Sequence, residues 1–432
     1  MRMTGDQDRL FGWYHALESP GRRTFWGCFG GYALDALDVH LFGFVAPVLA
    51  VVWGLGHAEL GAVTSATLIA SAIGGWGAGM LADRIGRVRT LQITIIWFSV
   101  FAFLSGLAPS YPWLVAFRAL QGIGFGGEWT MSAVLMAEVV RPAFRGRTLG
   151  FVQSAWAIGW GGAAALATVA QLLLPQELAW RLVFLVGIVP AGFVIFVRRL
   201  VPESPEYLLA RPDRLATTAI FRSPWRRGTL MGTMLAFGAH GGYYSLTTWL
   251  PMLLRTERHM ALSAAGAYYF VQTIGALLGY WAGAYASDAI GRRKTFSVFA
   301  AASVGMLLIV TLAPLSAMTM IVLAAPLGFA AAGIYSGLGA QLAELYPTEF
   351  RGSGQGFCYN AGRGGAALLP VMVGVLSPAL GLPVAVALLG AAPFAFVILI
   401  AAILPETAGQ ALGRLGGRHD GQNSASALSA RL

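Results

Sequence analysis

Apolar residues run in twelve long stretches along the chain, and short polar segments separate them. A helix of about 20 apolar residues spans the ~30 Å hydrocarbon core of a bilayer. The pattern therefore predicts an all-α membrane protein with twelve transmembrane helices. The stretches lie near residues 24–50, 60–82, 89–108, 112–138, 148–173, 181–200, 228–252, 262–285, 295–313, 317–342, 353–378 and 382–404.

Both ends of the chain are polar. The opening segment, MRMTGDQDRLFGWYHALESPGRR, lacks the apolar region and small-residue cleavage site of a secretory signal peptide. The closing segment, which contains GRHDGQNSASALSA, has the composition of a disordered tail. We expect residues 411–432 to form a cytoplasmic tail.

Composition and charge support a membrane protein. Only 11% of the 432 residues are charged, whereas soluble domains average about 25%. The net charge of +10 could suggest nucleic acid, but all except five of the 29 Lys and Arg residues fall on one side of the predicted membrane. This asymmetry follows the positive-inside rule and places both termini in the cytoplasm. The exceptions are Arg181, Arg255 and Arg258 on the other side, and Arg118 and Arg363 within spans.

The chain contains an internal repeat. DRIGRVRT (83–90) matches DAIGRRKT (288–295) at an offset of 205, and AEVVRPAFRGRTLGF (137–151) matches AELYPTEFRGSGQGF (343–357) at an offset of 206. A six-helix unit used twice is one of the known constructions of transporters, with the substrate site near the midplane between the halves. We expect halves at residues 1–205 and 228–410, joined by a cytoplasmic linker at 206–227.

Several of these segments resemble signatures of the major facilitator superfamily. GMLADRIGR (79–87) is similar to the signature between helices 2 and 3, and LVAFRALQGIG (114–124) to the helix-4 signature. PESPEYL (202–208) and PETAGQAL (405–412) resemble segments that follow helices 6 and 12 in the sugar-porter and organic-ion branches. The resemblance covers essentially the whole chain and implies a transporter whose two halves rock about a central site.

Three features narrow the branch. DALD (35–38) and YSLTTWLP (244–251) resemble segments of the aromatic acid:proton symporters and of the related sialate and lactate symporters. AWAIGWGGAAA (155–165) lacks the Gly-Pro pair of drug:proton antiporters. Ala36 stands where the aromatic-acid branch usually has glycine, which favours the sialate and lactate branch as the nearer relative.

Two aspartates, Asp35 and Asp38, interrupt the first apolar stretch. They share one helix face, about 16 Å deep if the helix begins near residue 24. A charge at the bilayer centre costs roughly 2.5–3.5 kcal/mol on insertion scales, and two neighbouring carboxylates in a low dielectric favour binding a proton. We interpret the pair as a proton-coupling site. The alternative is that each carboxylate makes a polar contact with another helix.

Arg363 lies about 15 Å inside the predicted eleventh helix. Its counterpart in the first half is Ala157, so the arginine belongs to one half only, as a substrate contact would. A guanidinium group matches the planar geometry of a carboxylate, and we predict that Arg363 binds the anionic group of a substrate. A fixed pairing with Asp35 or Asp38 is the alternative.

His240 occupies the place of Asp35 when the offset of 205 is applied. A histidine at this depth could gate protons or bind a substrate, although it could equally be a satisfied packing residue. Tyr243, Tyr244 and Asn360 are further donors expected to line the substrate site.

Arg118 and Glu128 share the fourth stretch, about 15 Å apart along a helix, so they cannot pair with one another. In the families that this chain resembles, the helix-4 arginine takes part in coupling proton binding to conformational change. We assign both residues to proton coupling, and we expect Glu128 to neutralise a charge on a neighbouring helix.

Acidic and basic residues recur together at the predicted cytoplasmic helix ends. In the resembled superfamily, such groups bridge the halves when the site faces outward and separate as it opens inward. We treat them as exposed ion pairs worth at most about 1 kcal/mol each, enough together to bias a two-state equilibrium. Anchoring by positive charge alone would leave the acids unexplained. The assigned gating residues are Asp83, Arg87, Glu138, Arg145, Asp288, Arg292, Glu344 and Arg351.

The sequence gives no sign of enzyme chemistry. GIGFGGE (122–128) is rich in glycine but lies within a predicted span, with no strand before it. Cys28 and Cys358 form neither a disulfide framework nor a metal-ligand spacing. We expect no cofactor or metal, and a proton gradient as the driving force.

These observations predict a proton-coupled symporter that imports a small organic carboxylate, lactate-, sialate- or aromatic-acid-like, across the cytoplasmic (inner) membrane by alternating access. Its expected partners are the anion, protons and the lipid bilayer, with no nucleic acid and as a monomer. One alternative is a sugar or polyol:proton symporter, in which Arg363 would sit in a structural ion pair. Another is a non-transporting receptor or sensor, which would lack substrate-dependent proton flux.

Overall fold

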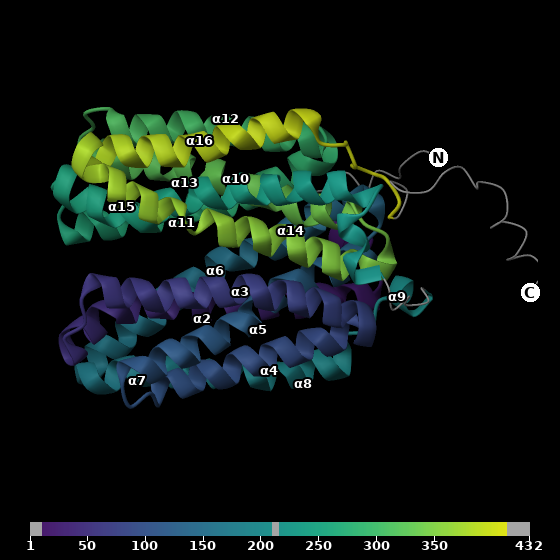
Figure 1. Cartoon of the computed structure of the whole chain (residues 1–432), viewed down its shortest axis with the longest axis horizontal. Helices are drawn as coiled ribbons and strands as arrows, with labels where there is room; N and C mark the ends of the chain where they lie inside the picture. The colour runs from purple at the N-terminus through teal and green to yellow at the C-terminus, as the bar shows by residue number, and fades with distance from the viewer. Residues whose placement is uncertain (1–10, 210–215, 413–432) are drawn as a thin grey trace, which may run out of the picture.

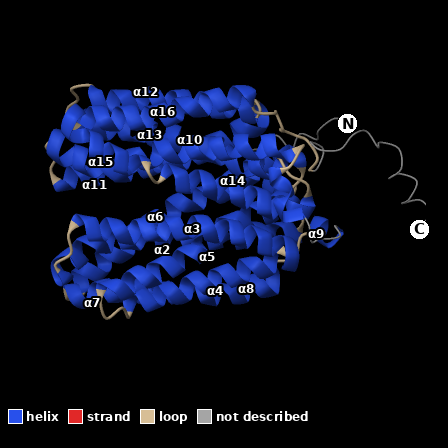
Figure 2. Cartoon of the chain, viewed as in Figure 1, coloured by secondary structure: helices blue, strands red, loops and turns tan. Residues whose placement is uncertain are grey.

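The described part of the chain is built from helices. The structure, a computed structural model, describes residues 11–209 and 216–412, and these ranges contain no β-strand (Figure 2). The long helices form two groups, with the first half below and the second half above in Figure 1. The remaining residues include most of the predicted tail at 411–432, part of the predicted linker and the first ten residues of the polar opening segment. Those predictions lie outside the described residues.

The first half contains six passes of the chain across the bundle. The first five are continuous helices, and a short 3-10 turn divides the sixth. Pro190, the second residue of the last helix, is compatible with a helix start there because its missing N–H is not needed in a first turn. The elements are α2 (Ser19–Trp53), α3 (His57–Ile85), α4 (Arg87–Gly106), α5 (Tyr111–Val139), α6 (Arg145–Leu173), α7 (Gln176–Leu185), η2 (Val186–Ile188) and α8 (Val189–Leu200).

The second half also makes six passes, and its fifth pass is interrupted before Pro370, the second residue of a new helix. The elements are α10 (Trp225–Met252) with a π-helical continuation η4 (Leu253–Glu257), α11 (Leu262–Ala289), α12 (Arg292–Leu312), α13 (Ala317–Glu344), α14 (Arg351–Ala366), α15 (Leu369–Leu380) and α16 (Leu382–Ile403).

Short elements gather at one end of the bundle, where α2 and α10 begin and α8 and α16 end. We call this the terminal end. The short elements there are α1 (Gly12–His15), η1 (Pro142–Phe144), α9 (Pro205–Leu209), η3 (Ala216–Phe221) and η5 (Thr348–Phe350).

Nine helical segments of the described chain are long and apolar enough to cross a membrane. The other three passes, α5, α10 and α11, have 29, 28 and 28 residues. They are long enough to cross as well. Buried polar residues lower the hydropathy of two of these helices: Arg118 and Glu128 in α5, and His240 in α10. The predicted twelve-helix, two-repeat fold is confirmed, whereas the breaks in the sixth and eleventh passes are not evident from the apolar pattern.

The halves meet along two helix pairs. α3 packs against α14, and α6 packs against α11. The offsets of 205 and 206 relate α3 to α11 and α6 to α14, so the two contacts are equivalent. The repeated loop motifs therefore lie at repeated contacts between the halves.

Gly79 lets α3 and α14 approach closely. A Cβ atom built on Gly79 would lie 2.2 Å from the carbonyl oxygen of Gly352. Because that neighbour is backbone, it cannot move aside as a side chain could. Small residues permit this kind of close helix contact in membranes.

Candidate functional site

Asp38 and Arg118 face each other inside the first half, Asp38 on α2 and Arg118 on α5. Both are buried. Arg118 donates a hydrogen bond to Gln121 Oε1 at 2.6 Å and lies over the rings of Phe42 and Phe184. Arg118 is the charged group that acts on Asp38, yet neither Asp38 oxygen has a hydrogen-bond partner among the described residues. The two groups attract one another without a direct hydrogen bond.

Asp35 faces a third carboxylate, that of Glu128 on α5. The carboxylate of Asp38 and the guanidinium of Arg363 are the other charged groups near Asp35. Glu128 lies against α2 at Gly31, where a built Cβ would be 2.6 Å from its Oε1. Glycine at position 31 therefore leaves the space that the carboxylate occupies.

The predicted Asp35–Asp38 pair is thus divided between two centres, because the helical twist turns Asp38 towards Arg118 and Asp35 towards Glu128. The expectation that Glu128 neutralises a neighbouring charge is wrong. The charged residue that it faces on α2 is another carboxylate. Its Oε1 accepts a hydrogen bond from Ser132 at 2.8 Å, and its Oε2 has no partner in the described chain.

Arg363 on α14 presents a buried guanidinium between aromatic rings. Its Nη2 donates to Asn360 Oδ1 at 2.7 Å, and the group lies 4.5 Å from the ring centre of Phe125 and 5.4 Å from that of Tyr359. Its Nε has no partner among the residues described. All four oxygens of Asp35 and Asp38 are also unpartnered there, so the alternative of a fixed ion pair is not what the structure contains.

His240 lies in a cluster of tyrosines close to Arg363. Its Nδ1 is 2.8 Å from the carbonyl oxygen of Ala236, and its ring contacts those of Tyr244, Tyr335 and Tyr359. Tyr243 packs on Tyr335 in the same cluster. The structure thus brings together the predicted residues His240, Tyr243 and Tyr244 in one cluster of aromatic rings.

Asn360 holds Arg363 in place and links the two halves. Its Oδ1 accepts from Arg363, and its Nδ2 donates to Thr130 Oγ1 of α5 at 3.2 Å and to Gly356 O at 2.9 Å. The amide is therefore fully engaged in this state. Asn360 lies at the expected place but acts on the arginine.

The first gating cluster joins α3, α4, α5 and α14 at the terminal end. Arg87 bonds to Asp83 and Glu138, and Arg351 from the other half bonds to Glu138 at 2.6 Å. Asp83 accepts hydrogen bonds from the backbone N–H groups of Gly352 and Ser353, at 3.0 and 2.8 Å. A carboxylate is favoured at this helix N-terminus by the helix dipole.

The second cluster repeats the first with the halves exchanged. Arg292 bonds to Asp288 and Glu344, and Arg145 from the first half bonds to Glu344 at 2.9 Å. Asp288 accepts from the backbone N–H groups of Gly146 and Arg147, both at 2.8 Å. All eight predicted gating residues therefore lie in two equivalent cross-half clusters.

These ion pairs are buried, which corrects the expectation that they are exposed. The eight side chains are at most 4% exposed. Segments near α9 and the end of α16 cover them. Removing one partner of a buried pair costs about 3–5 kcal/mol because it leaves a charge without compensation. Each cluster can thus shift the conformational equilibrium strongly.

Three further acids belong to these clusters and were missed as sites. Glu203 accepts from the N–H groups of Arg87 and Val88, and Glu406 accepts in the same way from Arg292 and Arg293. The similarity of PESPEYL to PETAGQAL is the signal that could have identified them. Glu206 bonds to Arg351 at 3.2 Å. Burial raises the pKa of Glu206, and the Arg351 charge opposes this rise.

Two aromatic stacks join the halves on the side of the clusters that faces away from the terminal end. Trp129 of α5 stacks on Tyr359 of α14 with ring centres 3.4 Å apart. Phe151 of α6 stacks on Trp281 of α11 at 5.6 Å. Away from the terminal end, α7 packs against α2, α4 and α6, and α15 packs against α10 and α16. The structure is therefore a state that is closed at the terminal end.

Comparison with known proteins identifies relatives along the whole chain. The sequence model described as Major Facilitator Superfamily matches residues 28–316 and 272–430. The Probable 4-methylmuconolactone transporter of Cupriavidus pinatubonensis is 40% identical, over 94% of this chain and 96% of that protein. The Gallate transporter of Pseudomonas putida is 30% identical, over 87% of this chain and 90% of that protein.

A relative from the predicted branch is more distant. The Sialic acid transporter NanX of Escherichia coli is 24% identical, over 90% of this chain and 95% of that protein. The preference for the sialate and lactate branch drawn from Ala36 is therefore not confirmed, because one residue of a motif carries less information than identity along the chain.

A solved structure shows the same fold. The proton:xylose symporter XylE bound to 6-bromo-6-deoxy-D-glucose superposes with a TM-score of 0.78. The alignment covers 91% of this chain and 98% of that one, at 20% identity. At this identity the likeness concerns the fold alone.

Proposed function

The chain belongs to the major facilitator superfamily, and on this premise we propose that it is a proton-coupled symporter of a small organic acid. The observation that carries the proposal is Arg363, a buried guanidinium with an unpartnered Nε between two aromatic rings. A buried charge of this kind is retained when it serves a function. A substrate carboxylate would complete its hydrogen bonds and neutralise it.

Relatives and surroundings favour a ring-bearing or conjugated acid. The 4-methylmuconolactone and gallate transporters have unsaturated substrates by name. In this chain, Phe125, Tyr359 and the tyrosines beside His240 surround Arg363. Aromatic walls with a few directed polar groups are typical of sites for flat ligands. We infer that the carboxylate meets Arg363 while the ring packs on these side chains.

Proton coupling would use the carboxyls of the first half. Asp35 is acted on by Arg363 and by Glu128 with opposite signs. When an anion occupies Arg363, the positive charge that offsets these carboxylates is lost, so binding of a proton becomes more favourable. Asp38 and Arg118 form the second centre, and both centres would link protonation to rocking of the halves.

The terminal end would face the cytoplasm. The positive charges gather there in the sequence, as the positive-inside rule requires. The described state is closed at that end, so it corresponds to the state that receives substrate from outside. Inward rocking would break the two gating clusters and release the acid and proton into the cell.

Uptake into proteoliposomes tests the substrate class. Labelled gallate would be offered with an inward proton gradient, and unlabelled benzoate, cis,cis-muconate, lactate, sialic acid, glucose and xylose would compete. Competition by aromatic or conjugated acids supports the proposal. Uptake of labelled glucose or xylose without uptake of any acid would overturn it in favour of a sugar symporter. Binding without transport of any compound would favour a sensor.

A further inference from the structure

Three buried carboxyls follow one another along the contact between α2 and α5. Along α2, Asp38 lies about 4.5 Å further from the terminal end than Asp35, and Gly31 lies about 6 Å nearer to it. Glu128 occupies the space beside Gly31. The order from the opposite end towards the terminal end is therefore Asp38, Asp35 and Glu128, all in the first half.

The surroundings of Glu128 suit a group that receives and gives a proton. It faces the carboxyl of Asp35 and the thiol of Cys28 on α2, and the hydroxyl of Ser132 on its own helix. From α4 it meets the apolar Ile95, near the same point of Gly31. No described positive charge pairs with it. Its Oε2 is buried and has no hydrogen-bond partner in the described chain.

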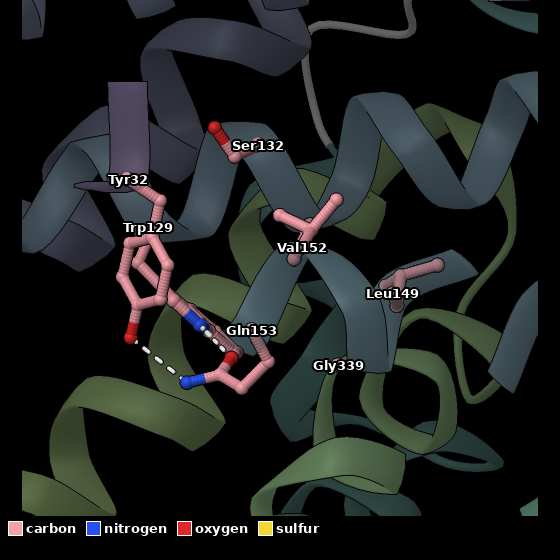
Figure 3. Close-up of a pocket in the computed structure, with 8 residues that line it drawn as sticks. Tyr32, Trp129, Ser132, Leu149, Val152, Gln153 and Gly339 are labelled. Atoms are coloured by element: carbon pink, nitrogen blue, oxygen red, sulfur yellow. Dashed lines mark hydrogen bonds between the residues drawn. The ribbon is translucent and has the colours of Figure 1, made fainter. Parts of the chain in front are cut away.

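Ser132 is one of the residues that line a small hollow between the helices (Figure 3). It lies one helical turn from Glu128 along α5, towards the terminal end. Its polar lining is a hydrogen-bonded chain: Trp129 Nε1 donates to Gln153 Oε1 at 2.7 Å, and Gln153 Nε2 donates to Tyr32 Oη at 2.8 Å. The rest of the lining is mostly apolar, with Ala133, Leu149 and Val152, and the hollow has room for about one water molecule beside these polar groups. The hollow also reaches Gly339 of the second half.

The stack of Trp129 on Tyr359 separates this hollow from Arg363. Tyr359 contacts the guanidinium on one side and Trp129 on the other, and Trp129 lines the hollow. A substrate at Arg363 is therefore blocked by the stack. The approach of Asp35 to Glu128 lies between α2 and α5 within the first half, so a proton that moves along it does not cross this stack between the halves.

We propose that Glu128, with Ser132 and the hollow beside it, is the release route of the coupling proton, distinct from the substrate path. The inference rests on the proposed symport. In the first step the O–H bond of Asp35 breaks and an O–H bond forms at Glu128 Oε2, so that the total charge of the pair is unchanged. In the second step the O–H bond at Glu128 Oε2 breaks and the proton passes to a water molecule that enters the hollow, which becomes hydronium, while Ser132 keeps its hydrogen bond to Glu128 Oε1.

Two transport modes distinguish this role from a structural one. Net uptake driven by an inward proton gradient requires the proton to leave in every cycle. Exchange of internal for external acid at equal pH does not, because the loaded carrier can return with its proton. Both would be measured in proteoliposomes with labelled gallate for the full-length wild type, Glu128→Gln, Glu128→Asp, Ser132→Ala and Ser105→Ala. Ser105 is a buried serine on α4 that donates to the carbonyl oxygen of Phe101, about 15 Å along the helix from Ile95, which lies beside Glu128.

We expect Glu128→Gln to lower net uptake about 100-fold, within the range for a positioned proton-transfer group, and to lower exchange far less than net uptake. Glu128→Asp should restore much of the net uptake, Ser132→Ala should slow it, and Ser105→Ala should behave as wild type. Net uptake unchanged in Glu128→Gln would overturn the relay, as would equal loss of both modes in a protein that still elutes as a folded species. A wild type that moves acid without protons would overturn the proposed symport itself and the relay with it.

Discussion

Single charged residues decide the chemistry of this molecule because so few of them are compensated. Asp35, Asp38 and Glu128 are fully or almost fully buried, yet five of their six carboxylate oxygens have no hydrogen-bond partner among the described residues. Leaving a buried charged group unsatisfied costs more than the usual 1–3 kcal/mol for a polar group. Such groups persist where a proton or a ligand completes them during function.

Arg363 gives the first test at this scale. Arg363→Gln removes the charge and the planar pair of donors, and hydrogen bonds to charged groups contribute about 1.5–3 kcal/mol. We expect the half-saturating concentration of the transported acid to rise about 10- to 100-fold. The control is Arg258→Gln, because Arg258 bonds to the backbone carbonyls of Val310 and Thr311 outside the site. Equal affinities in the two variants would exclude Arg363 as the anion contact.

Functional residues could be predicted from the sequence only where a charge stood inside an apolar stretch or where a motif was repeated in both halves. Arg363 and the aspartates are visible as charges in apolar stretches, and the gating residues as repeated motifs. The approach of Glu128 to Asp35 depends on how α2 crosses α5 at Gly31, which spacing along one helix does not determine. Nothing in the sequence distinguishes Ser132 and Gln153 from other polar residues, because their positions near Glu128 follow only from how the helices pack.

At the scale of elements, α3 and α14 cross closely in the closed state. We predict that Gly79→Val drives these helices apart, because its side chain would meet the Gly352 backbone. Spin labels at Arg89→Cys and Lys294→Cys, two exposed terminal-end positions in different halves, would report a longer distance. Gly77→Val is the control, since no atom lies within 4 Å of a Cβ built there. Equal distances in both variants would contradict the prediction.

The short helix α1 makes a second element-scale prediction. Trp13 is buried against Phe151 with ring centres 4.9 Å apart, and Phe151 stacks on Trp281 of the other half. Aromatic pairs contribute about 0.5–1.5 kcal/mol beyond their buried area. Trp13→Ala should therefore weaken the closed state, by up to about tenfold in the ratio of closed to open, as seen with the same spin labels.

The control for this variant is Trp113→Ala, an exposed tryptophan on α5. The role of α1 would be refuted if Trp13→Ala lowered the unfolding temperature and left the label distances of the folded protein unchanged. That outcome would mean that Trp13 stabilises both conformations equally.

At the scale of the whole molecule, the same cluster of ion pairs and helix-end hydrogen bonds occurs twice, with the halves exchanged. Asp83 binds the start of α14, and Asp288 binds the start of α6. Asp83→Asn and Asp288→Asn keep the shape of the side chain and remove its charge. Each should therefore shift the equilibrium between the closed and open conformations towards the open one by about 1.5–3 kcal/mol. The label distances should change in the same direction for both. Opposite shifts would show that the halves are not functionally equivalent.

The twelve spans, the repeat and the family could be predicted at this scale because they depend on apolar length and on motifs in register. The state of the molecule could not. Closure at the terminal end comes from contacts such as the Trp129–Tyr359 stack, which join residues more than 200 positions apart. The gating residues were expected to be exposed because the segments that cover them and pair with them are distant in the sequence. Once the halves come together, as at Arg351–Glu138 and Arg145–Glu344, these side chains are buried.

Proton movement that depends on an organic acid is the most direct measure of the central claim. Proteoliposomes that contain a trapped pH dye would receive gallate or cis,cis-muconate at equal internal and external pH. We predict internal acidification with the wild type and little or none with Asp35→Asn. Entry of labelled acid without acidification in the wild type would contradict the account, because the buried carboxyls would then not carry the coupling proton.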